Sequence, residues 1–286
     1  MLKTRVITAL VLLVIFLPIL FLTSPIFLYL LLSFFISLAA WEWGQLIWGK
    51  HSKNSYIYAI LVQCILLILC INLFYFSMDV APELIKYCIS SLWICSFFWV
   101  FIVPIIMRRQ LTFPLHQYQV GFAIIGLIIF IADWYAIVIL RNQGLWVFLS
   151  VVMLVWAADI GAYFFGKKFG KHKLALQLSP GKSIEGAIGG MFCVCLLALT
   201  FYQVGPDSNN FFSILARNQS VTILILATVF LTLMSITGDL FESQLKRLSG
   251  VKDSSGLLPG HGGVLDRLDA LLPVLPLAAL ILTSVA

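Results

Sequence analysis

Apolar residues occur along this chain in long blocks that are separated by short polar segments. A helix needs about 20 mostly apolar residues to cross the hydrocarbon core of a membrane, and nine blocks approach that length. The nine blocks are Val6–Leu22, Ile26–Trp41, Tyr56–Phe76, Cys88–Met107, Gly121–Leu140, Leu145–Phe165, Gly186–Val204, Val221–Thr237 and Val264–Ala286. The pattern therefore predicts an all-α integral membrane protein, a polytopic bundle of about nine transmembrane helices.

The composition fits this prediction. Hydrophobic residues make up 62% of the chain and charged residues 10%, and the mean hydropathy is +1.05, whereas soluble domains carry about 25% charged residues. Almost no sequence is left for a soluble domain, so we expect no nucleic-acid partner. The first block follows Lys3 and Arg5 but lacks a small-residue cleavage site. We therefore expect a retained helical hairpin and not a signal peptide.

Lys and Arg residues are distributed unevenly between the two sides of the predicted bundle. With the N-terminus in the cytoplasm, the outer loops hold only Lys86, Arg141 and Arg217 of the 18 Lys and Arg residues. Cytoplasmic loops of membrane proteins are enriched in these residues. We therefore expect a bacterial-type inner membrane protein with its N-terminus and charged loops in the cytoplasm, although the assignment depends on the number of spans. The basic side suits anionic head groups or anionic solutes.

The two halves of the chain differ in polar content. Residues 1–140 are Leu-, Ile- and Phe-rich blocks with short loops, and we predict that they form a transmembrane scaffold. Asp133 is the exception in this half. Its expected role is a structural hydrogen bond between helices, and a functional role is the alternative. Residues 141–286 carry the candidate chemistry and are predicted to form a catalytic transmembrane domain. No inverted repeat is visible, which argues against a transporter.

The helix predicted for the sixth block carries Asp159 near its C-terminal end. Small residues around it would let another helix approach the Asp159 face closely. These are Ala157, Ala158, Gly161 and Ala162. Lysines then follow in the next loop, namely Lys167, Lys168, Lys171, Lys173 and Lys182. The loop lysines would satisfy the positive-inside rule in any case, so their number alone does not establish a binding site.

The segment Ser179–Ser183, with the sequence SPGKS, predicts a turn that leads directly into a helix. Free amide groups at a helix N-terminus bind phosphate well, and a lysine beside them adds a point charge. Lys182 and Ser183 are therefore the strongest phosphate-binding candidates in this loop.

The eighth block ends in a polar stripe. Asp239, Glu242, Ser243 and Lys246 lie three or four residues apart, which places them on one face of a helix. An ion pair between Glu242 and Lys246 would explain part of the stripe but not Asp239. Carboxylate and hydroxyl oxygens one turn apart, as in Asp239 and Ser243, suit a hard cation such as Mg²⁺.

A second acidic helix end follows a Gly-rich loop. Gly260, Gly262 and Gly263 would let the backbone approach a phosphate closely, and Asp266 and Asp269 come directly after them. Two acidic helix ends that meet across a basic, Gly-rich loop predict a metal and triphosphate site.

The segment Ser243–Asp269, SQLKRLSGVKDSSGLLPGHGGVLDRLD, closely resembles the signature of the phosphatidate cytidylyltransferases, also called CDP-diacylglycerol synthases. The matching positions include Lys246, Arg247, Lys252, Asp253, His261, Gly262, Gly263, Asp266, Arg267 and Asp269. The segments DIGAYFFGKKFGK and LSPGKSIEG are similar to further motifs of the family, so the resemblance extends from Trp156 to the C-terminus. Gly181 departs from it, because many relatives carry a basic or amide residue there.

The resemblance implies a reaction between phosphatidate and CTP that gives CDP-diacylglycerol and pyrophosphate. The implied cofactor is Mg²⁺, alone or with a second cation. The lipid phosphate would be the nucleophile, so positioning and charge neutralisation would suffice. The implied catalytic residues are Asp239, Lys246, Arg247 and Asp266. The implied metal ligands are Asp239, Ser243 and Asp266, with Asp269 as a further candidate. The candidate phosphate-binding residues are Asp159, Lys167, Lys182, Ser183, Lys252, Asp253, His261, Gly262 and Gly263.

Several alternatives remain open at this point. Arg267 would pair with Asp269 or Asp239, and His261 would shape the turn as readily as it would transfer a proton. A related CTP-dependent nucleotidyltransferase or lipid kinase, acting on an isoprenoid lipid, would use a similar site. A transporter needs no such loop, and a pure scaffold leaves Asp239 and Asp266 unexplained. Membrane lipids are expected partners, and the sequence leaves a homodimer open.

Overall fold

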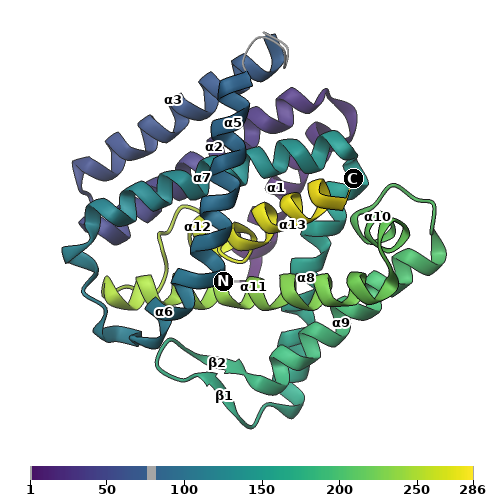
Figure 1. Cartoon of the computed structure of the whole chain (residues 1–286). Coiled ribbons are helices and arrows are strands. Elements are labelled where there is room, and N and C mark those ends of the chain that lie inside the picture. The colour runs from purple at the N-terminus through teal and green to yellow at the C-terminus, as the bar shows by residue number, and fades with distance from the viewer. Residues whose placement is uncertain (1, 76–81, 286) are drawn as a thin grey trace. The chain divides into compact units, whose positions relative to one another are not determined.

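The chain is almost entirely helical, as Figure 1 shows for a computed structural model that describes residues 2–75 and 82–285. Within these residues, seven helices are long and apolar enough to cross a membrane. Two further apolar helices, Val6–Leu22 and Leu271–Val285, are shorter. The all-α membrane class is confirmed, whereas the count of nine spans is not. The predicted block ends at Phe76 and Ala286 lie outside the described residues.

The fold consists of two compact units that interleave along the sequence. One unit comprises Met1–Ser91, Pro114–Trp134 and Leu245–Leu268. The other comprises Leu92–Phe113, Tyr135–Gln244 and Asp269–Ala286. Helices α7 (Gln119–Gln143) and α11 (Val221–Leu248) each continue from one unit into the other. The roles assigned to 1–140 as scaffold and 141–286 as catalytic domain stay predictions.

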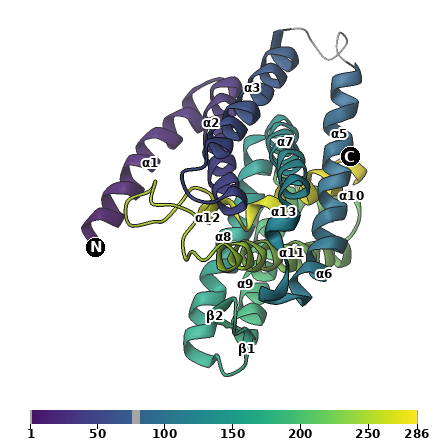
Figure 2. The same ribbon diagram turned by 90° about the vertical axis from the view of Figure 1, so that its left-hand side faces the viewer.

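Helix α2 lies at the centre of the first unit, with α3 packed along it (Figure 2). The indole of Trp43 donates a hydrogen bond of 3.0 Å to the carbonyl of Phe122 on α7. Gly126 makes room for that indole, because a Cβ there would lie 2.5 Å from Trp43 Nε1. A glycine at this crossing therefore lets α2 and α7 pack closely. The elements of this unit are α1 (Leu2–Leu22), α2 (Pro25–Trp48), α3 (Lys53–Tyr75), the start of α5 (Pro82–Phe97), η3 (Leu115–Gln117), parts of α7 and α11, and α12 (Leu265–Leu268).

Asp133 on α7 is buried, with 2% of its surface exposed. Neither of its carboxylate oxygens has a hydrogen-bond partner among the residues that the structure describes. The predicted structural hydrogen bond is therefore wrong for the described part of the chain. A carboxyl buried without such a partner is costly in a membrane helix.

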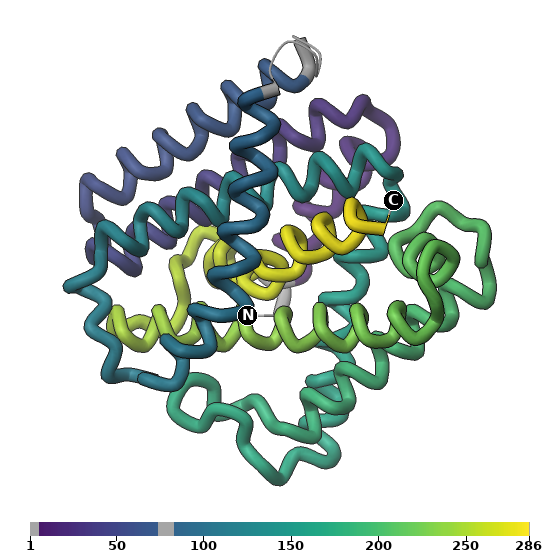
Figure 3. The backbone as a smooth tube through the Cα atoms, viewed as in Figure 1, coloured from purple at the N-terminus to yellow at the C-terminus, as the bar shows by residue number. Residues whose placement is uncertain are grey.

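The second unit is built around the α8–α9 pair. In Figure 3 the tube runs from α8 through a short hairpin into α9. A Cβ on Gly190 would lie 2.7 Å from the Ala158 carbonyl oxygen, and one on Gly186 would lie 2.8 Å from that of Ala162. The predicted close approach to the small residues of α8 is confirmed. The other elements are the end of α5, the π-helix η1 (Phe98–Ile102), α6 (Val103–Arg108), η2 (Gln110–Thr112), α8 (Leu145–Phe169), β1 (Lys173–Ala175), β2 (Ser179–Ser183), α9 (Ile184–Val204), α10 (Phe211–Asn218) and α13 (Leu271–Val285), with parts of α7 and α11.

The last predicted helix is broken. Helix α12 ends at Leu268 and α13 begins at Leu271, so the block Val264–Ala286 does not form one continuous span. Pro273 gives the physical reason, because a proline cannot bond to the carbonyl four residues before it and its ring collides with that carbonyl. The residue four positions earlier is Asp269, which lies in the break. A 15-residue α13 is only about 22 Å long.

Candidate active site

A cavity of about 460 Å³ in the second unit brings together several of the predicted site residues. Asp159 reaches it from α8, Lys182 and Ser183 from the end of β2, and Asp239 from α11. The small residues at the α8–α9 contact form much of its apolar wall. Two helices and a strand thus direct two carboxylates, an ammonium group and a hydroxyl group toward one space.

Lys182 and Asp239 form an ion pair in this cavity, through Lys182 Nζ and Asp239 Oδ2. Their side chains are 26% and 32% exposed, so solvent or a ligand can reach both charges. A partly exposed pair of this kind contributes little to stability. The pair therefore leaves a cation and an anion available for exchange with a charged ligand.

The SPGKS segment positions Lys182 differently from the prediction. The predicted turn is wrong, because residues 179–183 form strand β2, which pairs antiparallel with β1 in the register Lys173 to Ser183 and Ala175 to Ser179. The turn lies before it, where Leu178 N donates to the Ala175 carbonyl at 3.1 Å. Gly181 is exposed, and a Cβ added to it would meet no atom within 4 Å. A larger side chain would therefore fit at this position without a clash.

The predicted helix start after SPGKS is confirmed. Helix α9 begins at Ile184, and Ser183 is its N-cap, since its hydroxyl accepts a 3.1 Å hydrogen bond from Gly186 N. Glu185 in the first turn accepts bonds from the backbone of Lys171 at 3.0 Å and contacts His172 Nδ1 at 2.6 Å. This carboxylate ties the loop after α8 to the start of α9. The capping bond and the Glu185 contacts fix the strand that presents Lys182.

The other lysines of this loop are exposed. Lys167 Nζ lies 5.9 Å from the ring centroid of Tyr163, which itself lines the cavity. The structure places Lys167 next to a cavity residue, and its predicted role in phosphate binding stays a prediction.

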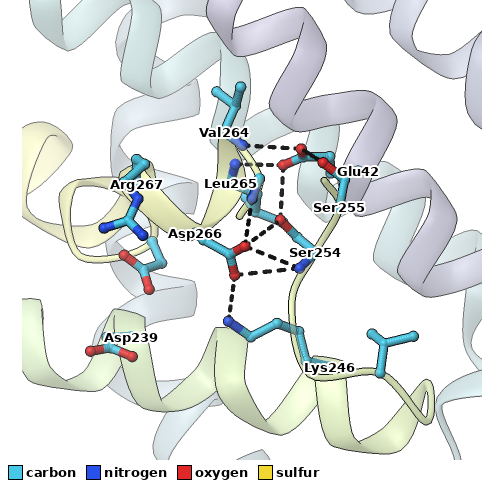
Figure 4. A network of polar contacts seen from close by, with 12 residues as sticks. Glu42, Asp239, Lys246, Ser254, Ser255, Val264, Leu265, Asp266 and Arg267 are labelled. Atoms are coloured by element: carbon cyan, nitrogen blue, oxygen red, sulfur yellow. Dashed lines mark hydrogen bonds and ion pairs between the residues drawn. The ribbon is translucent and has the colours of Figure 1, made fainter. Parts of the chain in front are cut away.

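A second polar cluster lies in the first unit, around Asp266 (Figure 4). Lys246 Nζ donates to Asp266 Oδ1 at 2.6 Å. Ser254 donates to Oδ2 through its backbone N at 3.1 Å and its hydroxyl at 3.0 Å, and Gly263 N donates at 2.8 Å. Asp266 is therefore surrounded by donors, and the structure brings together Lys246, Gly263 and Asp266 of the predicted site.

Glycines in the loop make this cluster possible. Gly260 and Gly262 have φ values of +79° and +83°, a backbone region that side chains other than glycine disfavour. A Cβ on Gly262 would lie 2.7 Å from Asp266 Oδ2, and one on Gly263 would collide with the Ser254 hydroxyl. The glycines predicted to admit a phosphate thus also give the Asp266 carboxylate its space.

The remaining charged residues of the motif lie at the surface of the first unit. Arg247 is exposed and donates to the Val251 carbonyl at 3.3 Å. Lys252 and Asp253 line a second cavity, of about 570 Å³, together with Lys50 and His51 of the α2–α3 loop. Arg267 Nε donates to the carbonyl of His261 at 3.1 Å. That contact uses the His261 backbone, and the role of the imidazole stays a prediction.

Glu42 on α2 is the important residue that the sequence prediction missed. It is fully buried, and its carboxylate accepts from Ser254 and Ser255 hydroxyls and from the backbone N–H groups of Val264 and Leu265. The predicted apolar block ends at Trp41, which leaves Glu42 as a boundary residue. Apolar residues continue to Trp48, and an acidic residue inside such a block is the signal that would have identified it.

A model of the cytidylyltransferase family matches residues 3–285. The chain belongs to the cytidylyltransferase family. The chain is 39% identical to a phosphatidate cytidylyltransferase of Pseudomonas aeruginosa, over 99% of this chain and 97% of the relative. A Haemophilus influenzae relative of the same name is 38% identical over 96% of each chain. A Staphylococcus aureus relative, also of that name, is 45% identical over 50% of this chain and 51% of its own.

These comparisons extend the resemblance that the motifs predicted. The motifs covered Trp156 to the C-terminus, whereas the cytidylyltransferase model covers nearly the whole chain. The family match therefore extends over the first half of the chain as well.

The oxygen donors that line the second-unit cavity fit a hard cation better than those around Asp266 in the first unit. In the second unit, Asp239 and Asp159 line the cavity with the hydroxyl residues Ser183 and Thr232, and such oxygen donors suit Mg²⁺. In the first unit, both Asp266 oxygens already accept bonds from protein donors. A metal at Asp266 would have to replace some of them.

The other two predicted metal ligands are Ser243, on α11, and Asp269, in the break between α12 and α13. Ser243 is half-buried on α11, and Asp269 Oδ1 accepts a 2.7 Å bond from Ala270 N. No group of three or more His, Cys, Asp or Glu residues is arranged to hold a metal within the part of the chain that the structure describes. The metal centre shared by Asp239, Ser243, Asp266 and Asp269 stays a prediction.

Proposed function

We propose that this protein is a phosphatidate cytidylyltransferase, which transfers CMP from CTP to phosphatidate and releases pyrophosphate. The observation that carries the proposal is the near full-length relationship to proteins of that name. The charged clusters support it, because a triphosphate and an anionic lipid need cations and oxygen ligands placed among apolar helices.

The proposed reaction is an in-line displacement at the α-phosphorus of CTP. An oxygen of the phosphatidate phosphate forms the new P–O bond, and the bond between the α-phosphorus and the bridging oxygen breaks, so that pyrophosphate leaves with the electron pair. The lipid phosphate is already ionised near neutral pH, so the protein has no proton to remove. Its task is to position two anions and to neutralise their charge.

Residues of the second-unit cavity would carry out part of this task. Lys182, on a strand fixed by the Ser183 cap and by Glu185, would bind a phosphate group when the ligand displaces its Asp239 contact. A divalent cation, Mg²⁺ in our proposal, would supply further charge neutralisation at Asp239 and Asp159. In the first unit, Lys246, Arg247 and Lys252 would bind phosphate groups of CTP or of phosphatidate.

The membrane supplies the second substrate and sets the location. Several apolar helices indicate a multi-pass membrane protein. We propose that the site opens to the cytoplasm, where CTP is found, and that the N-terminus lies on the same side. Phosphatidate would enter from the surrounding lipid.

The deciding experiment uses the purified protein in detergent with radiolabelled CTP and one lipid phosphate at a time. Phosphatidate should yield a labelled CDP-lipid and one pyrophosphate per product, and EDTA should stop the reaction until Mg²⁺ is restored. A product formed only with an isoprenyl phosphate would replace the proposal with an isoprenoid nucleotidyltransferase. Transfer of the γ-phosphate from γ-labelled CTP would indicate a kinase.

A further inference from the structure

We propose that Glu42 is a positioning residue, which holds residues 254–265 in the conformation that the reaction requires. The proposal rests on the function proposed above and adds a residue from the first third of the chain to its site. Glu42 lies on α2, more than 200 positions before the segment that it contacts.

The contacts use both oxygens of the carboxylate at both ends of the loop. Oε2 accepts from the Ser254 hydroxyl at 3.0 Å and from Leu265 N at 2.6 Å. Oε1 accepts from Val264 N at 3.0 Å and from the Ser255 hydroxyl. One side chain therefore joins the start of the loop, at 254–255, to its end, at 264–265 (Figure 4).

The charge of Glu42 is compensated by these contacts. The four donors are uncharged, two hydroxyls and two backbone N–H groups, and the carboxylate is 0% exposed. Hydrogen bonds to an ionised acceptor are roughly twice as strong as neutral ones. Removing the carboxylate would leave these buried donors without an acceptor. An unsatisfied buried donor costs more free energy than one hydrogen bond contributes on balance.

The effect reaches the predicted site through Ser254. Its hydroxyl lies 3.0 Å from Glu42 Oε2 and 3.0 Å from Asp266 Oδ2, and one hydroxyl proton can serve only one of them at a time. The Ser254 backbone N also donates to Asp266. The position of Ser254, set by Glu42, therefore determines how Asp266 and its partner Lys246 are held.

The same loop forms one wall of the 570 Å³ cavity. Ser254 and Ser255 line it beside Lys252 and Asp253, and Trp41, the residue before Glu42, lines it as well. A second bond anchors the loop to α2, from the Ser249 hydroxyl to the Leu46 carbonyl at 2.6 Å. Glu42 thus positions Lys252, a predicted phosphate ligand, indirectly, through the loop. Loss of the Glu42 carboxylate should therefore weaken CTP binding as well as turnover.

The test compares Glu42→Gln with Glu42→Asp and with Ser37→Ala. The glutamine keeps the shape of the side chain, but its NH₂ group must face Val264 N or Leu265 N, which cannot accept. We expect kcat/KM for CTP to fall about tenfold or more with a raised KM. Glu42→Asp, which keeps the charge but is too short to span both loop ends, should be intermediate. Ser37 is buried on the same helix, and within the described residues its hydroxyl bonds to the Phe34 carbonyl, so Ser37→Ala should behave as wild type.

Two further measurements separate positioning from a general loss of structure. Trypsin should cleave Glu42→Gln faster than wild type at Lys252, whereas cleavage at the exposed Lys173 of the hairpin should be unchanged. Ser255→Ala should lower activity on its own, but Ser255→Ala combined with Glu42→Gln should be no worse than Glu42→Gln alone.

The outcomes distinguish the two proposals. An inactive wild-type protein would refute the proposed function, and the trypsin comparison would still test the contact made by Glu42. An active wild type whose Glu42→Gln variant keeps its KM and its Lys252 cleavage rate would overturn the positioning role. Equal acceleration of cleavage at Lys252 and Lys173, with KM unchanged, would show that Glu42 serves stability alone.

Discussion

Lys246 Nζ lies 2.6 Å from Asp266 Oδ1, in a pair whose side chains are only 12% and 9% exposed. Removing one partner of a buried ion pair leaves an uncompensated charge, at a cost of about 3–5 kcal/mol. The charge of each residue is therefore tied to that of the other, and a change at either position affects both the loop and the predicted chemistry.

Asp266→Asn should abolish CDP-lipid formation at saturating Mg²⁺ and should lower the melting temperature in detergent. Combining it with Lys246→Met removes the stranded ammonium group, so the double variant should regain stability but not activity. Turnover of labelled CTP and a thermal-shift assay provide the two readouts. Near wild-type turnover in Asp266→Asn would remove this residue from the catalytic assignment.

Lys182→Ala should raise the KM for CTP more than it lowers kcat, because an ammonium group that binds the triphosphate acts in the ground state as well as in the transition state. Lys173→Ala is the matched control, since Lys173 pairs with Ser183 across the same hairpin and is exposed. Initial rates over a range of CTP concentrations measure both constants. If Lys182→Ala leaves both constants unaltered, Lys182 does not bind CTP, and the positive-inside rule alone accounts for its presence in this loop.

Gly190→Val should destabilise the second unit, because even its Cβ would lie 2.7 Å from the Ala158 carbonyl oxygen. Overpacking of this kind costs about 1–3 kcal/mol. Gly181→Ala, at a position with open space around it, should leave the melting temperature unchanged. Thermal unfolding of both variants in detergent tests the pair, and equal melting temperatures would contradict the close α8–α9 contact.

The sidedness of the loops can be tested with single cysteines at exposed positions. A membrane-impermeant thiol reagent added to intact cells should label Ser208→Cys above the wild-type background, but not Gly256→Cys. Permeabilised cells should show labelling at both positions. Labelling of Gly256→Cys alone in intact cells would reverse the proposed orientation and would separate the Gly-rich loop from cytoplasmic CTP.

Local patterns in the sequence predicted those structural features that depend only on residues near one another in the chain. Apolar blocks identified the helices, small residues around Gly161 predicted the α8–α9 approach, and the residues before Ile184 predicted a helix start. These features follow from hydrophobicity, side-chain size and capping, which act over a few residues.

Features that depend on distant residues were missed. The donors to Glu42 lie more than 200 residues away, and no short-range pattern identifies such a contact. The strand at SPGKS depends on pairing with residues 173–175. The break at Asp269 could have been predicted, because Pro273 lies inside the last apolar block. That block was defined by hydrophobicity alone, a criterion that ignores the effect of proline on a helix.

The distance in sequence between Glu42 and its donors affects how the protein is made. Ribosomes add about 5–20 residues per second, so the first donor, 212 residues after Glu42, is synthesised roughly 10–40 seconds later. During that interval the Glu42 carboxylate lacks all four of its donors, so water or another polar group must solvate it. Arrival of residues 254–265 then buries the carboxylate, so α2 reaches its final environment only after this segment has emerged.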